Sequence, residues 1–135
     1  MRVRTMIVQH TGWSRVVLLL VLLILSGCGP PKGERTMDRA NEQQAVDAYN
    51  RGVAYYARGE LDEAIASYTE AVRLNPKLAD AYLNRGAAYD AKGELDEAIA
   101  DFTQALRLNP KDAEAHNNRG VAYKSKGDLD KAIAD

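Results

Sequence analysis

AVDAYNRGVAYYARGELDEAIASYTEAVRLNPKL, residues 45–78, is followed at once by ADAYLNRGAAYDAKGELDEAIADFTQALRLNPKD, residues 79–112. The two stretches align without a gap, and 22 of their 34 positions are identical. A third copy, residues 113–135, is still in register at Asp135. Self-similarity at this period is typical of helical repeat arrays, in which each unit buries its apolar face only by stacking on the next. We therefore expect an all-α protein of two full units and a shortened third.

Each unit is expected to hold two helices. The first helices are predicted at residues 45–58, 79–92 and 113–126, where a cation precedes a glycine that can adopt the left-handed conformation at a helix end. Acidic residues then open the second helix, and Asn-Pro closes both full units. A glycine also recurs inside each first helix, where it costs about 0.5 to 1 kcal/mol relative to alanine. This repetition indicates a close helix crossing at Gly52, Gly86 and Gly120, with Ala64, Ala98 and Ala132 as the expected partners.

The pattern within a unit resembles the tetratricopeptide repeat. Small residues stand at unit positions 8, 20 and 27, aromatic residues at 11 and 24, and proline at 32, and the resemblance covers residues 45–135. It implies helix-turn-helix units stacked as a right-handed superhelical array. The first unit departs from the family with Ala48 at position 4, where a large aromatic residue is usual. Position 7, usually leucine, is arginine in every copy (Arg51, Arg85, Arg119), and we interpret it as an arginine whose stem packs while its head pairs with an acid.

The first 27 residues have the layout of a secretory signal. Three arginines and no acid precede residue 28, and residues 16–25 form an unbroken apolar run of ten. Ten residues rise about 15 Å as a helix, half of a bilayer core, so a spanning helix is disfavoured. Leu25, Ser26, Gly27 and Cys28 resemble the lipobox of bacterial lipoproteins, in which the cysteine is lipidated and the signal is cut just before it. The alternatives are an ordinary membrane anchor with an incidental cysteine, or a signal cut at another residue.

Residues 28–40 are predicted to be the lipidated cysteine and a flexible tether, since residues 29–39 carry two prolines, two glycines and no apolar period. Asn41 is the expected N-cap, with Gln44 in the capping-box position, so the first helix is predicted to start near Glu42 and the repeat domain to span residues 41–135. The residue after Cys28 is Gly29, where the family's inner-membrane retention signal has aspartate. The resemblance therefore implies the cell envelope, and the outer membrane facing the periplasm in an organism with two membranes.

Composition argues against several classes of function. Lys and Arg total 18 and Asp and Glu total 19; without the three N-terminal arginines the balance is 15 − 19 = −4, so there is no basic stripe for nucleic acid. One cysteine and two histidines, His10 and His116, do not supply a plausible metal site. His116 replaces Tyr82 at unit position 4 and is interpreted as a packed or hydrogen-bonded core residue. We find no catalytic constellation and expect no cofactor and no enzymatic activity.

What remains is a surface for binding. Arrays that resemble this one bind extended peptides or partner helices in a concave groove lined by the first helices. The family's lysine at position 5 and asparagine at position 9, which clamp a C-terminal carboxylate, are absent here, so that specificity is not expected. Asn50, Asn84 and Asn118 recur and could hydrogen-bond a peptide backbone. Carried over from the family, the groove candidates are Val46, Tyr49, Asn50, Val53, Tyr56, Asp80, Leu83, Asn84, Ala87, Asp90, Glu114, Asn117, Asn118, Val121 and Lys124.

The resulting hypothesis is a non-enzymatic scaffold or adaptor, anchored to the envelope membrane through a lipid on Cys28, that holds a protein or peptide partner in the groove. The alternative is a structural lipoprotein that associates with its own copy through its open C-terminal end. A truncated fragment of a longer array is also compatible with the sequence, because the third unit reaches only 23 of 34 positions and leaves an apolar face of the second unit partly covered.

Overall fold

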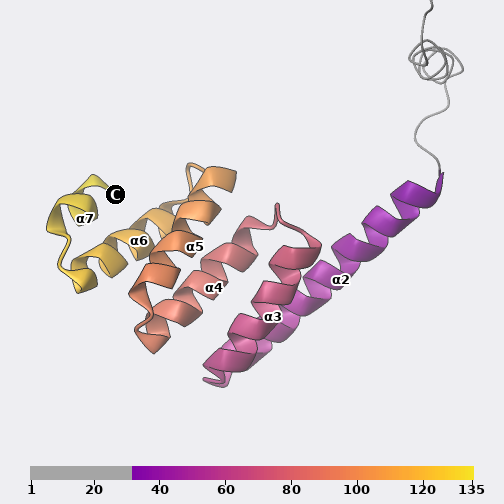
Figure 1. Ribbon diagram of the computed structural model, residues 1–135, viewed down its shortest axis with the longest axis horizontal. Helices are drawn as coiled ribbons and strands as arrows, with labels where there is room; N and C mark the ends of the chain where they lie inside the picture. Colours follow the sequence, from indigo (N-terminus) through magenta and orange to yellow (C-terminus); the bar gives the residue numbers. More distant parts are fainter. Residues whose placement is uncertain (1–31) are drawn as a thin grey trace, which may run out of the picture. The chain divides into compact units, whose positions relative to one another are not determined.

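The computed structural model describes the backbone of residues 32–135 and the side chains of residues 38–135. The predicted signal segment and Cys28 lie outside the described residues. Over the described range the chain forms helices only, and residues 37–135 make one compact unit (Figure 1). The helices are α2 (Lys32–Ala57), α3 (Leu61–Leu74), α4 (Ala79–Lys92), α5 (Leu95–Leu108), α6 (Ala113–Lys126) and α7 (Leu129–Ala134).

The start of α2 corrects the prediction for the tether. The helix begins at Lys32, ten residues before the expected start near Glu42, so residues 32–40 are helical and not a flexible coil. No proline lies between Pro31 and Pro76. Once a helical turn has formed, each further residue adds a hydrogen bond at little cost, so the helix extends upstream past Asn41. Further along α2, the side-chain amide of Gln43 donates to Asp47 one turn later, at 3.0 Å.

The other helix boundaries agree with the sequence. Helices α4 and α6 have the predicted bounds, and Gly59, Gly93 and Gly127 all have positive φ. Asp112 caps α6: its side chain accepts from the backbone N–H of Glu114 at 3.0 Å and of Ala115 at 3.1 Å. Short-range signals therefore determine where these helices stop and start.

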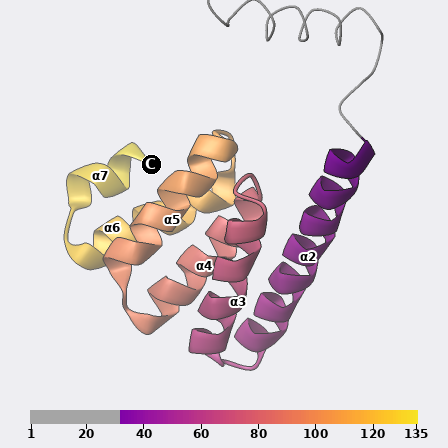
Figure 2. The same ribbon diagram turned by 45° about the vertical axis from the view of Figure 1, so that its right-hand side comes forward.

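Stacking of the units creates the core. Helix α4 packs against α3 and α5, and α5 packs in turn against α6, as the two ribbon views show (Figures 1 and 2). One buried cluster joins the first unit to the second through Ala48, Ala71, Val72 and Ala81. A second cluster joins the second unit to the third through Leu83, Ala98, Phe102, Ala105, Leu106, Ala115 and Ala122. Each unit therefore buries its apolar face only with the help of its neighbour.

The close crossing at the helix glycines is present, but in the first and second units its main partner differs from the expected alanine, whereas Ala132 is the nearest residue to Gly120 as predicted. A Cβ added at Gly86 would lie 2.7 Å from Cε1 of Phe102 and 3.2 Å from the carbonyl oxygen of Ala98. At Gly52 the nearest atom is Cε1 of Tyr68, at 2.5 Å, and not an atom of Ala64. The glycine makes room for the buried aromatic ring at unit position 24, because that ring is the bulkiest group between the two helices. In the second unit, the backbone carbonyl of Ala98 is a further neighbour of Gly86.

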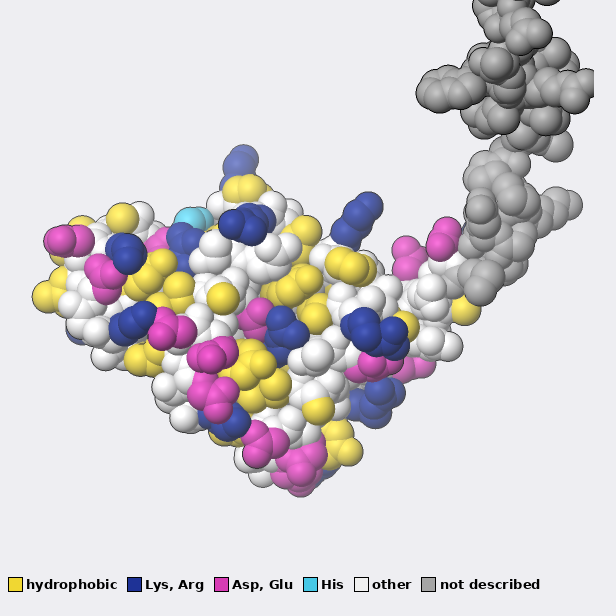
Figure 3. Space-filling view, in the orientation of Figure 1, with side chains coloured by type: hydrophobic (Ala, Val, Ile, Leu, Met, Phe, Trp, Pro, Cys, Tyr) yellow, Lys and Arg dark blue, Asp and Glu magenta, His cyan; other side chains and the backbone are white. Residues whose placement is uncertain are grey.

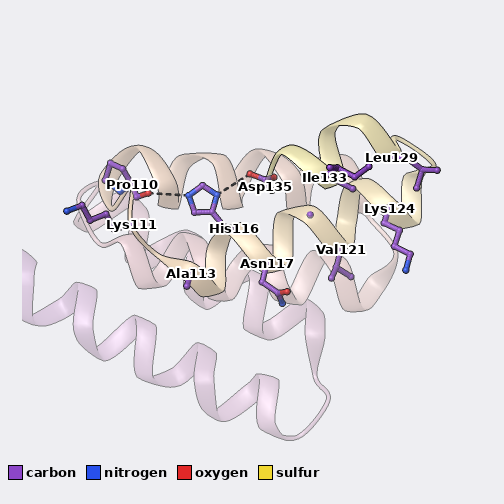
Figure 4. Close-up of a pocket in the computed structure, with 12 residues that line it drawn as sticks. Pro110, Lys111, Ala113, His116, Asn117, Val121, Lys124, Leu129, Ile133 and Asp135 are labelled. Carbon is purple, nitrogen blue, oxygen red and sulfur yellow. Dashed lines mark hydrogen bonds and ion pairs between the residues drawn. The ribbon is translucent and has the colours of Figure 1, made fainter.

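The third unit lacks this ring within residues 113–135. Around Gly120 the nearest atoms to an added Cβ are the carbonyl oxygen of Ala132 at 3.4 Å and Cβ of Asp135 at 3.5 Å, which is ordinary contact. A hollow of about 790 Å³ lies between α6 and α7, with Val121, Leu129 and Ile133 around it (Figure 4). Ile133 is 84% exposed and belongs to a helix of only six residues. The apolar face at this end of the array is therefore open in the described unit.

His116 has the structural role expected of it. It is half-buried, with Nδ1 3.1 Å from Oδ1 of Asp135 and Nε2 3.2 Å from the carbonyl oxygen of Pro110 (Figure 4). Both ring nitrogens are thus engaged in tying α6 to the residues on either side of it. This confirms the interpretation of His116 as a hydrogen-bonded residue.

The recurring arginine pairs with an acid in two of the three units. Arg85 donates from Nε and Nη2 to the two carboxylate oxygens of Asp101, both at 2.7 Å, and from Nη1 to Thr69 of the preceding unit at 3.1 Å. Arg119 repeats the arrangement with Asp135 and Thr103. The interpretation from sequence is confirmed for these two units. In the first unit the acid is replaced by Ser67 and Arg51 is exposed.

Candidate functional site

The residues predicted to line the groove all lie on three helices of the repeat domain, α2, α4 and α6. A hollow of about 320 Å³ is formed by α2, α4 and α6 with a contribution from α5. Three helices that are far apart in sequence therefore build a single concave site. Its lining residues are Tyr56, Asn84, Ala87, Asp90, Ala91, Phe102, Glu114, Asn118 and Val121.

Seven of the fifteen candidates line this hollow, and most of the others are exposed on the same three helices. Val46, Val53 and Val121 are among the most exposed large apolar side chains of the described unit. Val121 also lines the larger hollow at the C-terminal end, together with Asn117 and Lys124, so the two hollows share this residue of α6. The other exposed candidates are Asn50, Tyr56, Asp80, Glu114, Asn117 and Lys124.

Leu83 was predicted to line the groove, but the structure buries its side chain. It is only 7% exposed and belongs to the cluster that joins the second unit to the third. Its side chain packs toward Phe102 and the alanines of α6, because stacking of the third unit covers it. A ligand in the groove therefore finds almost no surface of Leu83, although position 5 of the first unit, Tyr49, is half-buried and partly accessible.

Phe102 was not among the candidates, yet it lines the hollow from α5. The ring is 1% exposed, so it supports the floor of the hollow from beneath and itself offers a ligand almost no surface. It can do so because Gly86, which crosses over the ring, carries no side chain. The glycine that recurs at unit position 8 was the available signal, but its partner could not be identified without the crossing geometry.

A polar contact links two of the first helices inside the groove. The side-chain amide of Asn84 donates to the hydroxyl oxygen of Tyr49 at 2.8 Å. Burial and the negative charges of Asp80 and Glu114 raise the pKa of Tyr49, while the hydrogen bond from Asn84 opposes them. The hydroxyl therefore keeps its proton at neutral pH and can donate it to a ligand. One donor of Asn84 is already used, so of the three recurring asparagines it has the least freedom to bind a peptide backbone.

The groove carries a negative charge. Among the fifteen candidates, Asp80, Asp90 and Glu114 oppose the single cation Lys124, a balance of 1 − 3 = −2. Within residues 38–135 none of these three carboxylates forms an ion pair. On the face drawn in Figure 3, charged side chains of both signs are interspersed with hydrophobic ones, and Lys and Arg do not gather into a stripe. The groove is therefore distinguished by its net negative charge.

The described residues offer contacts for binding and no group of at least three His, Cys, Asp or Glu side chains arranged to hold a metal. None of the helices that the structure describes is both long and apolar enough to cross a bilayer. The site consists of an apolar floor, hydrogen-bonding amides and carboxylates, which suits recognition of another chain.

These features define a helical repeat protein with a concave binding face. A family model described as TPR repeat matches residues 52–93 and 88–127, which together span more than half of the chain. The chain therefore belongs to the tetratricopeptide repeat family.

Solved structures with the same fold support this. The crystal structure of MamA is 34% identical with a TM-score of 0.66, over 67% of this chain and 53% of MamA, so the chain spans about half the length of MamA. The Arabidopsis OM64 TPR domain is 31% identical with a TM-score of 0.68, over 70% of this chain and 78% of that domain. The second TPR of Spaghetti (RPAP3), bound to the HSP90 peptide SRMEEVD, is 32% identical with a TM-score of 0.68, over 70% and 88% of the two chains. No curated protein matches the chain.

Proposed function

We propose that this protein is a non-enzymatic interaction scaffold that binds a peptide or a partner helix in the groove formed by α2, α4 and α6. The observation that carries the proposal is the hollow of about 320 Å³, which residues from three repeat units line together. A protein of the same fold, RPAP3, has been solved with a heptapeptide bound, which supports a peptide ligand here as well. The polar side chains around the floor would orient such a ligand.

The groove is tested by placing a photo-crosslinking amino acid at one position at a time in the full chain, expressed in its native host. Val53 and Glu114 lie on the groove helices, while Ala66 and Ala100 are exposed on α3 and α5 and serve as controls. We expect one and the same adduct from both groove positions and none from the two controls. Adducts of equal yield from all four positions, or none from the groove, would contradict the proposed function.

The proposal includes a membrane anchor. The sequence Leu25-Ser26-Gly27-Cys28, after a basic segment and an apolar run of ten, supports lipidation of Cys28 and removal of residues 1–27. Each buried methylene contributes about 0.8 kcal/mol, so two or three acyl chains would hold the protein on the membrane almost permanently. The scaffold would then act at the surface of the bacterial envelope, and Gly29 favours the outer membrane facing the periplasm where there are two membranes.

Replacement of Cys28 by serine tests the anchor. The wild-type chain is expected to lose 27 residues and to partition into the detergent phase of a Triton X-114 extraction. The variant should keep its full mass and remain unprocessed, because serine has no thiol for the acyl transfer that precedes cleavage. Mass spectrometry of the purified proteins gives the result. Normal cleavage of the variant after Gly27 would falsify the lipoprotein assignment.

A structural role through self-association is the second candidate, and the open face at α6 and α7 favours it. Leu129 and Ile133 are exposed there beside the hollow of about 790 Å³. A self-associating protein would sediment as a larger species as its concentration rises. A monomer at the highest concentration reached would remove this candidate and leave the groove proposal unaffected.

A further inference from the structure

The acidity of the groove bears on the kind of ligand it accepts. Asp90 and Glu114 line the hollow, from α4 and α6 respectively, and Asp90 is half-buried. Asp80 lies on the same helix as Asp90, and its charge and that of Glu114 both act on the hydroxyl of Tyr49. The three carboxylates are therefore distributed along the groove, around the pair formed by Tyr49 and Asn84.

Several carboxylates elsewhere in the array meet cations from the protein itself. Asp101 is held by Arg85 at 2.7 Å, and Asp62 by Lys92 of the next unit at 2.7 Å. Lys126 forms the corresponding contact with Asp96. At these positions the array sets a lysine or arginine opposite the acid. Asp80, Asp90 and Glu114 have no such partner within residues 38–135, so their charges remain available to a ligand.

Beside these charges the hollow also presents apolar groups. Tyr56, Ala87 and Val121 line it, and the side chains of Tyr56 and Val121 are exposed. An apolar side chain of a ligand would displace water from Tyr56 and Val121, and a cation beside it would reach a carboxylate. A ligand carboxylate in the same place would be repelled, because like charges brought together at an interface cost binding free energy.

We propose that the groove selects an extended peptide segment in which an apolar residue is flanked by lysine or arginine, and that it rejects acidic segments. This inference rests on the proposed function of the groove and specifies its ligand. It separates this protein from RPAP3, whose bound heptapeptide SRMEEVD carries two glutamates and an aspartate.

The test uses three fluorescein-labelled heptapeptides with amidated C-termini: SRMEEVD, the analogue SRMQQVN in which the three acids are replaced by their amides, and the basic analogue SRMKKVK. Binding to the full chain in a non-ionic detergent is followed by fluorescence anisotropy at about 50 mM and about 500 mM salt. We expect SRMKKVK to bind at least tenfold more tightly than SRMEEVD at the lower salt concentration, with SRMQQVN between them. High salt should reduce the difference because it screens exposed charges.

Two matched variants distinguish the groove from the overall charge of the protein. The first combines Asp80→Asn, Asp90→Asn and Glu114→Gln, and it should lose most of the tenfold preference. The second combines Glu63→Gln, Glu97→Gln and Asp130→Asn, which are exposed on α3, α5 and α7, and it changes the net charge equally but should keep the preference. Glu114→Gln alone, at an exposed position, should lower the preference in part and serves if the triple variant does not fold.

Equal or reversed affinities, no binding of SRMKKVK up to 1 mM, or an equal loss in both triple variants would overturn the inference. None of these results alters the outcome of the photo-crosslinking experiment. Groove-specific adducts together with a preference for SRMEEVD would therefore reject the basic ligand and retain the scaffold.

Discussion

Replacing Arg85 by alanine is expected to lower the free energy of unfolding by about 3 kcal/mol, the cost of removing one partner from a buried ion pair. Its side chain is 16% exposed and that of Asp101 9%, and two hydrogen bonds of 2.7 Å join them. Without the arginine, the carboxylate of Asp101 stays buried with no cation. Thr69 of the preceding unit also loses its contact. For a folded domain of roughly 60 to 100 residues, this loss should lower the melting temperature by roughly 12 °C or more.

Arg51→Ala is the matched control, because Arg51 stands at the same unit position but is exposed and forms no ion pair within residues 38–135. Its removal should change the stability by less than about 0.5 kcal/mol, as is usual for exposed residues. In a double-mutant cycle with Asp101→Ala, the Arg85→Ala change should cost much less than it does alone. Urea unfolding followed by circular dichroism measures the wild type and the four variants. Equal effects at Arg85 and Arg51 would contradict the account of the ion pair.

Gly86→Ala should also destabilise the array, by about 2 kcal/mol, although alanine is the better helix former. The new methyl group would lie 2.7 Å from Cε1 and 2.9 Å from Cδ1 of Phe102, and 3.2 Å from the carbonyl oxygen of Ala98. The ring is buried and cannot swing away, and the carbonyl belongs to the backbone of α5. The two helices must therefore separate at their crossing, which loosens the core between the second and third units.

Gly120→Ala gives the comparison, since the nearest atoms to its methyl group lie at 3.4 and 3.5 Å. Here the helix propensity of alanine should dominate and the stability should be unchanged or rise by up to about 1 kcal/mol. In thermal melts, the melting temperature of Gly86→Ala should therefore fall, while that of Gly120→Ala should stay unchanged or rise. A Gly86→Ala variant as stable as the wild type would show that the crossing is looser than described.

Much of the fold follows from the sequence alone. The 34-residue period, the glycines after each first helix and the Asn-Pro pairs are local signals, and they predicted the bounds of α4 and α6. The acid at unit position 23 likewise lies within the same 34-residue unit as its arginine. Such features are predictable because they depend on backbone geometry near one residue, or on a contact within one repeat.

Other features depend on contacts between units and could not be predicted. Leu83 has the spacing of a groove residue, yet the third unit buries it. Phe102 belongs to α5, yet it lies beneath a hollow that is lined mainly by α2, α4 and α6. The early start of α2 at Lys32 has a different cause, because propagation of the helix overrode the capping signal at Asn41. Burial at one position depends on the side chains that a neighbouring repeat brings to it, and these are set by how closely the helices cross. Sequence determined the helices of this protein and their order, whereas tertiary packing decided which side chains remain for a partner to bind.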